Sequence, residues 1–325
     1  MKLKTECSPH IRANDNTARI MLDVIIALIP ALVAGIVIFG ARVLMVVATS
    51  VAASVMSEWV LLKLTKRPGS IGDFTAVVTG LLLALALPVS VPYHVVAIGA
   101  VFSIAIAKLL CGGIGKNAFN PALSGRAFVM LLFPDALVRY AVPCAVMGLG
   151  NTVDIVSSAT SLHHMQIPAL PSVTLLDCFL GSMGGCIGEV STLALLIGGV
   201  YLLVRRVINI RIPAGYLGSV ALLTLIYGKG ESPILWMAYS LLSGGVVMAA
   251  LFMATDYASS PVTPAGQWIY GIGCGVLTVV FRYNGLFPEG ATYAILIMNA
   301  ASRLIDRLTV PRVYGHSRGG GIKCG

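Results

Sequence analysis

The chain has 325 residues, of which 57% are apolar and only 11% are charged, whereas about 25% of the residues in a soluble domain are charged. With a mean hydropathy of +0.91, it has more apolar surface than a water-soluble globule could bury. These values exclude a soluble enzyme and predict an all-α polytopic membrane protein. We expect no nucleic-acid partner despite the net charge of +9, because the basic residues fall at the ends of apolar segments.

Ten apolar segments are candidate membrane spans, if a full crossing takes about 17 to 25 residues and shorter pieces are allowed where Gly or Pro interrupts a helix. The first is long enough to be a retained signal anchor. In chain order, the segments are Asp23–Phe39, Leu44–Leu62, Phe74–Leu87, Val95–Leu110, Leu123–Phe133, Gly185–Val204, Ala214–Tyr227, Pro233–Met253, Trp268–Phe281 and Tyr293–Leu304. Half of them hold only about a dozen residues, which predicts tilted or broken helices.

Basic residues predict which side of the membrane each connection occupies. With the N-terminus in the cytoplasm, 18 of the 22 Lys and Arg residues fall on the cytoplasmic side, and the other four are Arg42, Arg139, Lys229 and Arg282. The predicted organisation is a cytoplasmic N-terminal segment at 1–22, a first membrane half at 23–133, an extracytoplasmic loop at 134–184, a second membrane half at 185–304 and a cytoplasmic C-terminal tail at 305–325.

Two stretches interrupted by Gly or Pro follow the fourth and the eighth span, at Cys111–Pro121 and Ala254–Pro261. Pro92 precedes the end of the first stretch by 29 residues, and Pro233 precedes the end of the second by 28. The similar intervals favour two related halves with broken helices, an arrangement common in transporters and ion-coupled proteins. The sequence does not decide between a parallel and an inverted repeat.

The long polar loop contains the string Asp154-Ile-Val-Ser-Ser-Ala-Thr160. It resembles the flavinylation motif of the family that contains the D subunit of the Rnf complex and the B subunit of the sodium-pumping NADH:quinone oxidoreductase. By this resemblance Thr160 is the acceptor and Asp154 a recognition handle, while Ser157, Ser158 and Ala159 are small neighbours that let a modifying enzyme approach. The family usually has Gly where this chain has Ser158. Taken alone, such a Ser- and Thr-rich string is also typical of a solvated loop.

Three further segments resemble the same family: Asn120–Phe128, Ala254–Pro264 and Glu289–Asn299. The resemblance covers nearly the whole chain. Its quinone-reductase branch has a longer N-terminal extension, whereas the first span here starts at Asp23, so the Rnf branch is favoured. The fold implied by the resemblance is a bundle of about ten transmembrane helices, similar to urea and ammonium transporters.

The resemblance also implies a function. It indicates a redox subunit of a translocase in the inner (cytoplasmic) membrane, which passes electrons between ferredoxin and NAD while Na⁺ or H⁺ moves. FMN would be joined through its phosphate to the hydroxyl of Thr160 by a separate flavin transferase, and a second, non-covalent flavin (riboflavin or FMN) is compatible with the family. The implied partners are the other Rnf subunits, including a second flavin-bearing subunit and iron–sulfur subunits, together with membrane lipids.

Six ionisable residues fall close to membrane depth, where charge is costly and is usually paired or functional. They are Glu58, Asp73, Lys108, Arg126, Glu189 and Asp256. We hypothesise that Asp256, in the second break, and Lys116 or Arg126, in or beside the first, line a central cavity that holds a second flavin or the moving ion. The alternative is a ten-helix solute transporter or channel without flavin. We expect no metal at His163 and His164, because adjacent side chains diverge.

Overall fold

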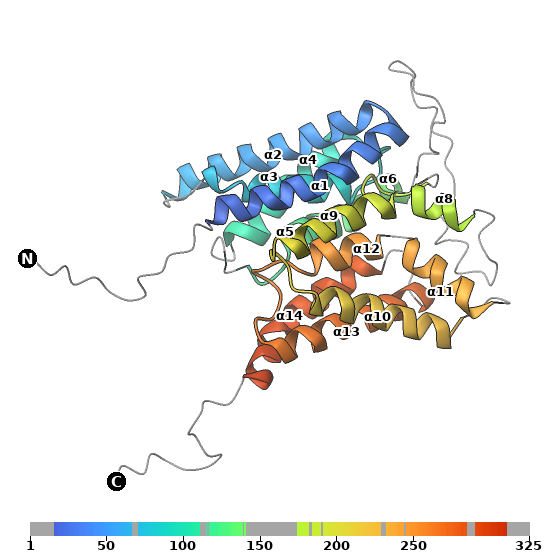
Figure 1. Ribbon diagram of the computed structural model, residues 1–325. Helices are drawn as coiled ribbons and strands as arrows, with labels where there is room; N and C mark the ends of the chain where they lie inside the picture. The colour runs from blue at the N-terminus through green and yellow to red at the C-terminus, as the bar shows by residue number, and fades with distance from the viewer. Residues whose placement is uncertain are drawn as a thin grey trace, which may run out of the picture.

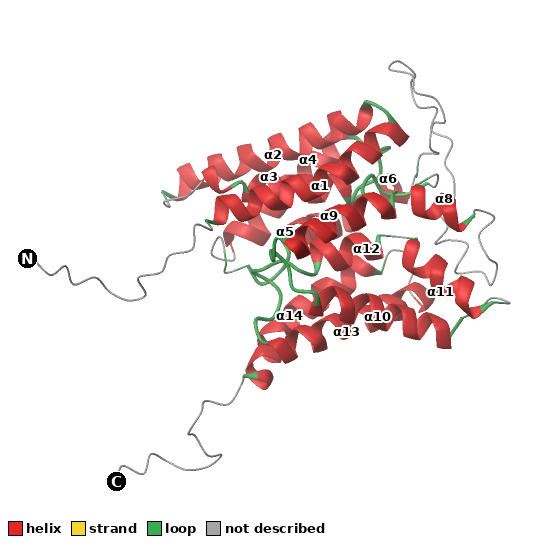
Figure 2. Cartoon of the chain, viewed as in Figure 1, coloured by secondary structure: helices red, strands yellow, loops and turns green. Residues whose placement is uncertain are grey.

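The computed structural model describes residues 16–66, 71–110, 115, 117–138, 140, 174–181, 184–189, 191–228, 232–243, 245–284 and 290–310. All regular structure in these ranges is helical (Figure 2). The helices are α1 (Thr17–Phe39), α2 (Arg42–Thr65), η1 (Ile71–Asp73), α3 (Thr75–Leu85), α4 (Tyr93–Phe102), η2 (Ser103–Leu110), α5 (Pro121–Leu132), α6 (Pro134–Val138), α8 (Leu175–Leu180), α9 (Thr192–Val204), α10 (Arg211–Ile226), α11 (Pro233–Leu242), α12 (Val246–Met248), η3 (Ala249–Met253), α13 (Pro264–Asn284) and α14 (Ala291–Thr309). Among the η segments, η2 and η3 are π-helices.

The all-α class and several membrane spans are confirmed. Within the described residues, four helical segments are long and apolar enough to cross a membrane: α1, α2, α4 with η2, and α13. A fifth span results if α11 and the α12–η3 segment, bent by 62° at their break, count as one. The shorter apolar helices α3, α5, α9 and α10 also fall on predicted spans. The total of ten spans therefore stays a prediction.

Several predicted boundaries differ from the observed helices. Helix α1 begins at Thr17, inside the predicted N-terminal segment, and α14 continues to Thr309, inside the predicted tail. The sixth span was predicted from Gly185, but α9 begins only at Thr192. The segment before it is not helical: Cys186 forms an isolated bridge with Pro88, residues 187–189 form a turn, and the N–H groups of Ile187 and Gly188 bond to carbonyls of the first half. Apolar composition does not distinguish such a buried non-helical segment from a helix.

The helices of the second half repeat the packing contacts of the first half. Helix α2 packs on α3 and α4, as α10 packs on α11 and α13, and α4 packs on α5 as α13 packs on α14. The first and last members of each half, α1 with α9 and α5 with α14, meet at the seam between the halves. This pattern supports two related halves but matches α4 to α13. The proline-interval comparison, which matched the fourth span to the eighth, was therefore wrong.

The relation between the halves is inverted. Along α1, Asp23 pairs with Arg205, the Ala27 carbonyl lies against Gly198, and Gly35 lies against Ile187. Residue numbers rise along α1 while they fall along its partner segment, so the matched helices α1 and α9 run antiparallel. This direction answers the question that the sequence left open.

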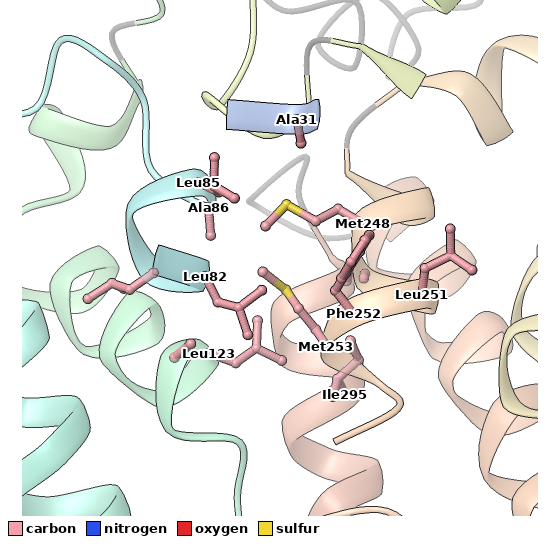
Figure 3. Close-up of a cluster of buried hydrophobic side chains, with 14 of the residues drawn as sticks. Ala31, Leu82, Leu85, Ala86, Leu123, Met248, Leu251, Phe252, Met253 and Ile295 are labelled. Carbon is pink, nitrogen blue, oxygen red and sulfur yellow. The ribbon is translucent and has the colours of Figure 1, made fainter. Parts of the chain in front are cut away.

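The apolar core lies on the seam between the halves. Figure 3 shows Leu82, Leu85, Ala86 and Leu123 of the first half facing Met248, Phe252, Met253 and Ile295 of the second. Helix α1 begins and α14 ends at the same end of the bundle, whereas α6 and α8, which flank the long connection, lie at the opposite end (Figure 1). We call these the α1 end and the α8 end.

Candidate functional site

The predicted flavinylation residues lie outside the described part of the chain. These are Asp154, Ser157, Ser158, Ala159 and Thr160. Lys116 also lies outside it, whereas Asp256 and Arg126 are described. The geometry available for a site is therefore that of the helix bundle.

A cavity of about 310 Å³ lies at the α1 end of the seam. Its lining includes the beginnings of α1, α3 and α5 and the segment that follows η3. Apolar side chains such as Leu82, Leu251 and Phe252 form much of the wall, and a few polar groups interrupt it. A small-molecule pocket usually measures about 300–1,000 Å³ and combines mainly apolar walls with few polar groups. The cavity meets both criteria, at the lower limit of size.

Asp256 lines this cavity. It follows η3 in the second break, and its carboxylate accepts a hydrogen bond from Ser259 Oγ at 2.9 Å. Burial raises the pKa of this carboxyl group, and the hydrogen bonds from Ser259 and the Ala258 backbone oppose the shift. A carboxylate at the wall of an apolar cavity can bind either a proton or a cation.

Asn120 joins the two broken regions at the cavity. Its Oδ1 accepts hydrogen bonds from the N–H groups of Ala122 and Leu123 and so caps the start of α5. Its Nδ2 donates to the Met253 carbonyl at the end of η3, at 3.0 Å. One side chain therefore satisfies a helix N-terminus of one half and a helix C-terminus of the other. We did not single out Asn120 from the sequence, although the Asn-Pro pair at the start of a helix was a usable signal.

Among the described residues of the cavity wall, Lys108 carries a positive charge. Its Nζ donates to Glu58 Oε1 at 2.5 Å and to Thr75 Oγ1 at 2.7 Å. The side chains of Lys108 and Glu58 are only 3% and 5% exposed. Two of the six ionisable residues that we singled out thus form a buried pair, and that pair holds α2, η2 and the start of α3 together.

Arg126 does not share the cavity with Asp256. Its Nη1 lies 3.7 Å from Glu189 Oε1, and its Nη2 donates to Cys186 Sγ at 3.3 Å. A separate space of about 10 Å³ adjoins Arg126 and Glu189, beside Gly245 and the start of α14. The hypothesis that placed Arg126 in one cavity with Asp256 is therefore not what the structure shows.

Arg282 is a buried arginine, although the count of basic residues assigned it to the extracytoplasmic side. It donates from Nη1 to the Ser240 carbonyl at 2.6 Å and from Nη2 to the Ser243 carbonyl at 2.9 Å. These carbonyls lie at the end of α11, where the chain breaks before α12. The guanidinium thus caps a broken helix and lies at the negative end of its dipole.

Comparison with known proteins by sequence assigns the chain to a family. The chain matches the sequence profile of the "NQR2, RnfD, RnfE family" over residues 4–315. The chain belongs to this family. The resemblance inferred from the loop string and the three segments is thereby confirmed at the level of the family.

The relatives of this NQR2/RnfD/RnfE chain are similar along nearly the whole length. It is 46% identical to the D subunit of the Na(+)-translocating ferredoxin:NAD(+) oxidoreductase complex of Acetobacterium woodii, over 97% of this chain and 96% of that protein. It is 39% identical to the D subunit of the proton-translocating ferredoxin:NAD(+) oxidoreductase complex of Clostridium ljungdahlii, over 96% of each. It is 36% identical to the D subunit of the ion-translocating oxidoreductase complex of Stutzerimonas stutzeri, over 93% of each.

Proposed function

We propose that the chain is the D subunit of an Rnf-type complex, which couples electron transfer between ferredoxin and NAD to the movement of an ion across the membrane. The observation that carries this proposal is the 46% identity to a D subunit of a ferredoxin:NAD(+) oxidoreductase complex over 97% of the chain. The membrane-spanning helices are those expected of such a subunit. The complex, rather than this chain alone, would be the enzyme.

We further propose that Thr160 carries FMN as a phosphoester. Support comes from the string Asp154–Thr160, which has the small residues and the acceptor of the family motif. A threonine hydroxyl is a weak nucleophile, so a separate flavin transferase would have to activate it. When bound, FMN supplies a ring that accepts one or two electrons, and the loop supplies its attachment.

Fluorescence in a denaturing gel tests this attachment. The assembled complex is run under ultraviolet light as the wild type, as Thr160→Ala and as the matched control Thr152→Ala, which removes another hydroxyl from the same loop. We expect the fluorescent band of this subunit to disappear only in Thr160→Ala. A band that persists in Thr160→Ala rejects Thr160 as the site.

A second, non-covalent flavin or the transported ion would occupy the cavity at the α1 end. The size and the apolar lining are those of a small-molecule pocket: Leu82, Leu251 and Phe252 offer apolar walls for a flavin ring, and Lys108 and Asn120 also line the cavity. Such a flavin would be released on denaturation, unlike the covalent one. Its extraction from the native complex, followed by chromatography, distinguishes riboflavin from FMN.

The carboxylate of Asp256 would bind the transported ion. The names of two relatives specify different ions, Na⁺ in one and protons in the other, so identity to either does not select one for this chain. Replacing Asp256 with Asn keeps the size of the side chain but removes its charge. We expect ion transport by the complex to fall while the fluorescent band remains, and unchanged transport would refute a role for Asp256.

The orientation proposed for the chain places both termini in the cytoplasm and the 134–184 loop outside. The count of basic residues supports it, as does the position of the first and last described helices at one end of the bundle. Labelling of single cysteines at positions 152 and 320 with an impermeant reagent in intact cells tests it. Labelling at position 320 alone would reverse the orientation.

The competing function is that of a solute transporter or channel without flavin. The inverted halves and the helix breaks beside the cavity are compatible with it. The visible absorption spectrum of the purified subunit separates the two proposals, because a transporter predicts no flavin bands and transport by the subunit alone.

A further inference from the structure

A polar pocket lies between α1 and α9, at the α1 end of the seam. It measures about 630 Å³ and is lined by Asn16, Ala18, Arg19, Leu22, Asp23, Phe74 and Arg205. It is separate from the cavity of Asp256, since the two share none of these lining residues. Nothing in the proposed electron transfer or ion movement uses it.

The pocket is lined by two arginines, Arg19 and Arg205. Arg205 Nη2 donates to Asp23 Oδ2 at 3.0 Å, and Tyr201 donates to the other carboxylate oxygen at 2.9 Å. Asp23 is thereby buried to 11% exposure, while Arg205 remains 48% exposed. Arg19 is exposed on the same side of α1. Guanidinium groups bind phosphate oxygens through paired, charge-assisted hydrogen bonds.

Two apolar stripes begin at this pocket and run along the surface away from it. On α1 the exposed residues are Leu22, Ile26, Ile29, Val33 and Val37, and on α9 they are Val204, Val200, Ile197 and Leu193. Both sets have helical spacing. The first stripe is about 22 Å long and the second about 16 Å, at 1.5 Å per residue. Each spans the hydrocarbon part of one leaflet, which is about 15 Å.

Helical phase places both stripes on one face of the molecule. In α1, the exposed stripe lies roughly 100° or more around the helix axis from the residues that contact α9, such as Ala27, at 100° per residue. In α9, the stripe lies at a similar angle from the residues that contact α1, such as Gly198. Because α1 and α9 run antiparallel, the two stripes face the same side of the molecule. An occupant of the pocket thus meets charge at the end of the bundle and two parallel apolar tracks beyond it.

We propose that this pocket binds an anionic phospholipid with one phosphodiester, such as phosphatidylglycerol. Its phosphate lies between Arg19 and Arg205, and its acyl chains follow the stripes on α1 and α9. Phe74, which is 40% exposed beside the pocket, contacts the upper part of the chains, as aromatic side chains do at membrane interfaces. Basic pockets between transmembrane helices are typical sites for such headgroups. The lipid would bridge the two halves where they meet.

Native mass spectrometry of the full chain in detergent tests the site. Phosphatidylglycerol, phosphatidylcholine and inorganic phosphate are each titrated against the wild type, Arg19→Gln and the control Arg303→Gln, which removes an exposed arginine near the end of α14. We expect phosphatidylglycerol to bind more tightly than phosphatidylcholine, and Arg19→Gln to weaken it by about five-fold. Arg303→Gln should leave the affinity unchanged. Equal affinity for both lipids, an equal effect of both variants, or phosphate displacing the lipid fully would overturn the proposal.

Photocrosslinking in native membranes separates a lipid from a protein occupant. A photoreactive residue at Ile26, inside the α1 stripe, is compared with one at Leu222, an exposed apolar position of α10. We expect Ile26 to capture phosphatidylglycerol in excess over its share of the membrane, and Leu222 to capture lipids in proportion to their abundance. Capture of another subunit at Ile26, or proportional capture at both positions, would overturn the proposal.

Discussion

The buried pair of Glu58 and Lys108 makes the sharpest stability prediction. Replacing Glu58 with Gln keeps the shape of the side chain but leaves the Lys108 ammonium with Thr75 Oγ1 as its neutral partner, at 2.7 Å. Removing one member of a buried ion pair costs about 3–5 kcal/mol, because the remaining charge stays buried. We expect Glu58→Gln to cost about 3 kcal/mol, since Gln still accepts a hydrogen bond, and Lys108→Met to cost about 4 kcal/mol.

The double variant decides whether burial of charge is the cause. Glu58→Gln with Lys108→Met leaves no charge, so it should cost less than either single change. Unfolding of the full chain by dodecyl sulfate in mixed micelles, followed by circular dichroism, measures these values. Ser57→Ala is the matched control, because the hydroxyl of Ser57 bonds to the Ser54 carbonyl of its own helix, and it should change stability by less than about 0.5 kcal/mol. Single-variant costs below about 1 kcal/mol, or strictly additive costs, would refute the reasoning.

Three other changes give distinct outcomes in the same unfolding assay. Gly198→Ala would place a Cβ 2.0 Å from the Ala27 carbonyl, so it should destabilise the α1–α9 contact by about 1–3 kcal/mol, whereas Gly218→Ala, with open space around it, should be neutral or slightly stabilising. Arg282→Met should cost about 3 kcal/mol or more, because it removes two charged hydrogen bonds to buried carbonyls; full retention of stability would contradict the capping role. The pKa of Asp256 is raised in the folded state, so stability should fall as pH rises through the interval between its unfolded and folded pKa values. Asp256→Asn should abolish that fall, and an unchanged profile would assign it to other groups.

The sequence predicted where the helices are better than where they end. Apolar composition located α1 and α2 to within six residues at either end. It missed the first turn of α13, which begins at Pro264 rather than Trp268, because its polar and small residues do not add to hydropathy. It also assigned the non-helical segment before α9 to a helix, since an apolar run does not reveal whether its backbone bonds are local or made with another segment.

Counting basic residues by side assigned every Lys and Arg to one side of the membrane, and some of them lie inside the bundle instead. Arg282 counted as an outer surface charge, yet it is buried and bonded to the carbonyls at the end of α11. Arg126 counted as an inner charge, yet it lies in the core beside Glu189. A positive charge near the end of an apolar run can anchor a helix at the membrane surface or cap a broken helix inside, and only tertiary contacts distinguish the two.

The inverted repeat relates the two internal spaces to each other. The start of α5 lines the cavity of about 310 Å³, and the start of its counterpart α14 lines the space of about 10 Å³ at Arg126. Since inversion exchanges the two ends of the bundle, the small space is the counterpart of the cavity on the α8 side. In the small space, the Arg126–Glu189 pair lies against the wall, and little volume remains beside it. The repeat thus builds one potential site toward each end, and of these two described spaces the one that contains Asp256 and Lys108 is large enough for a small molecule.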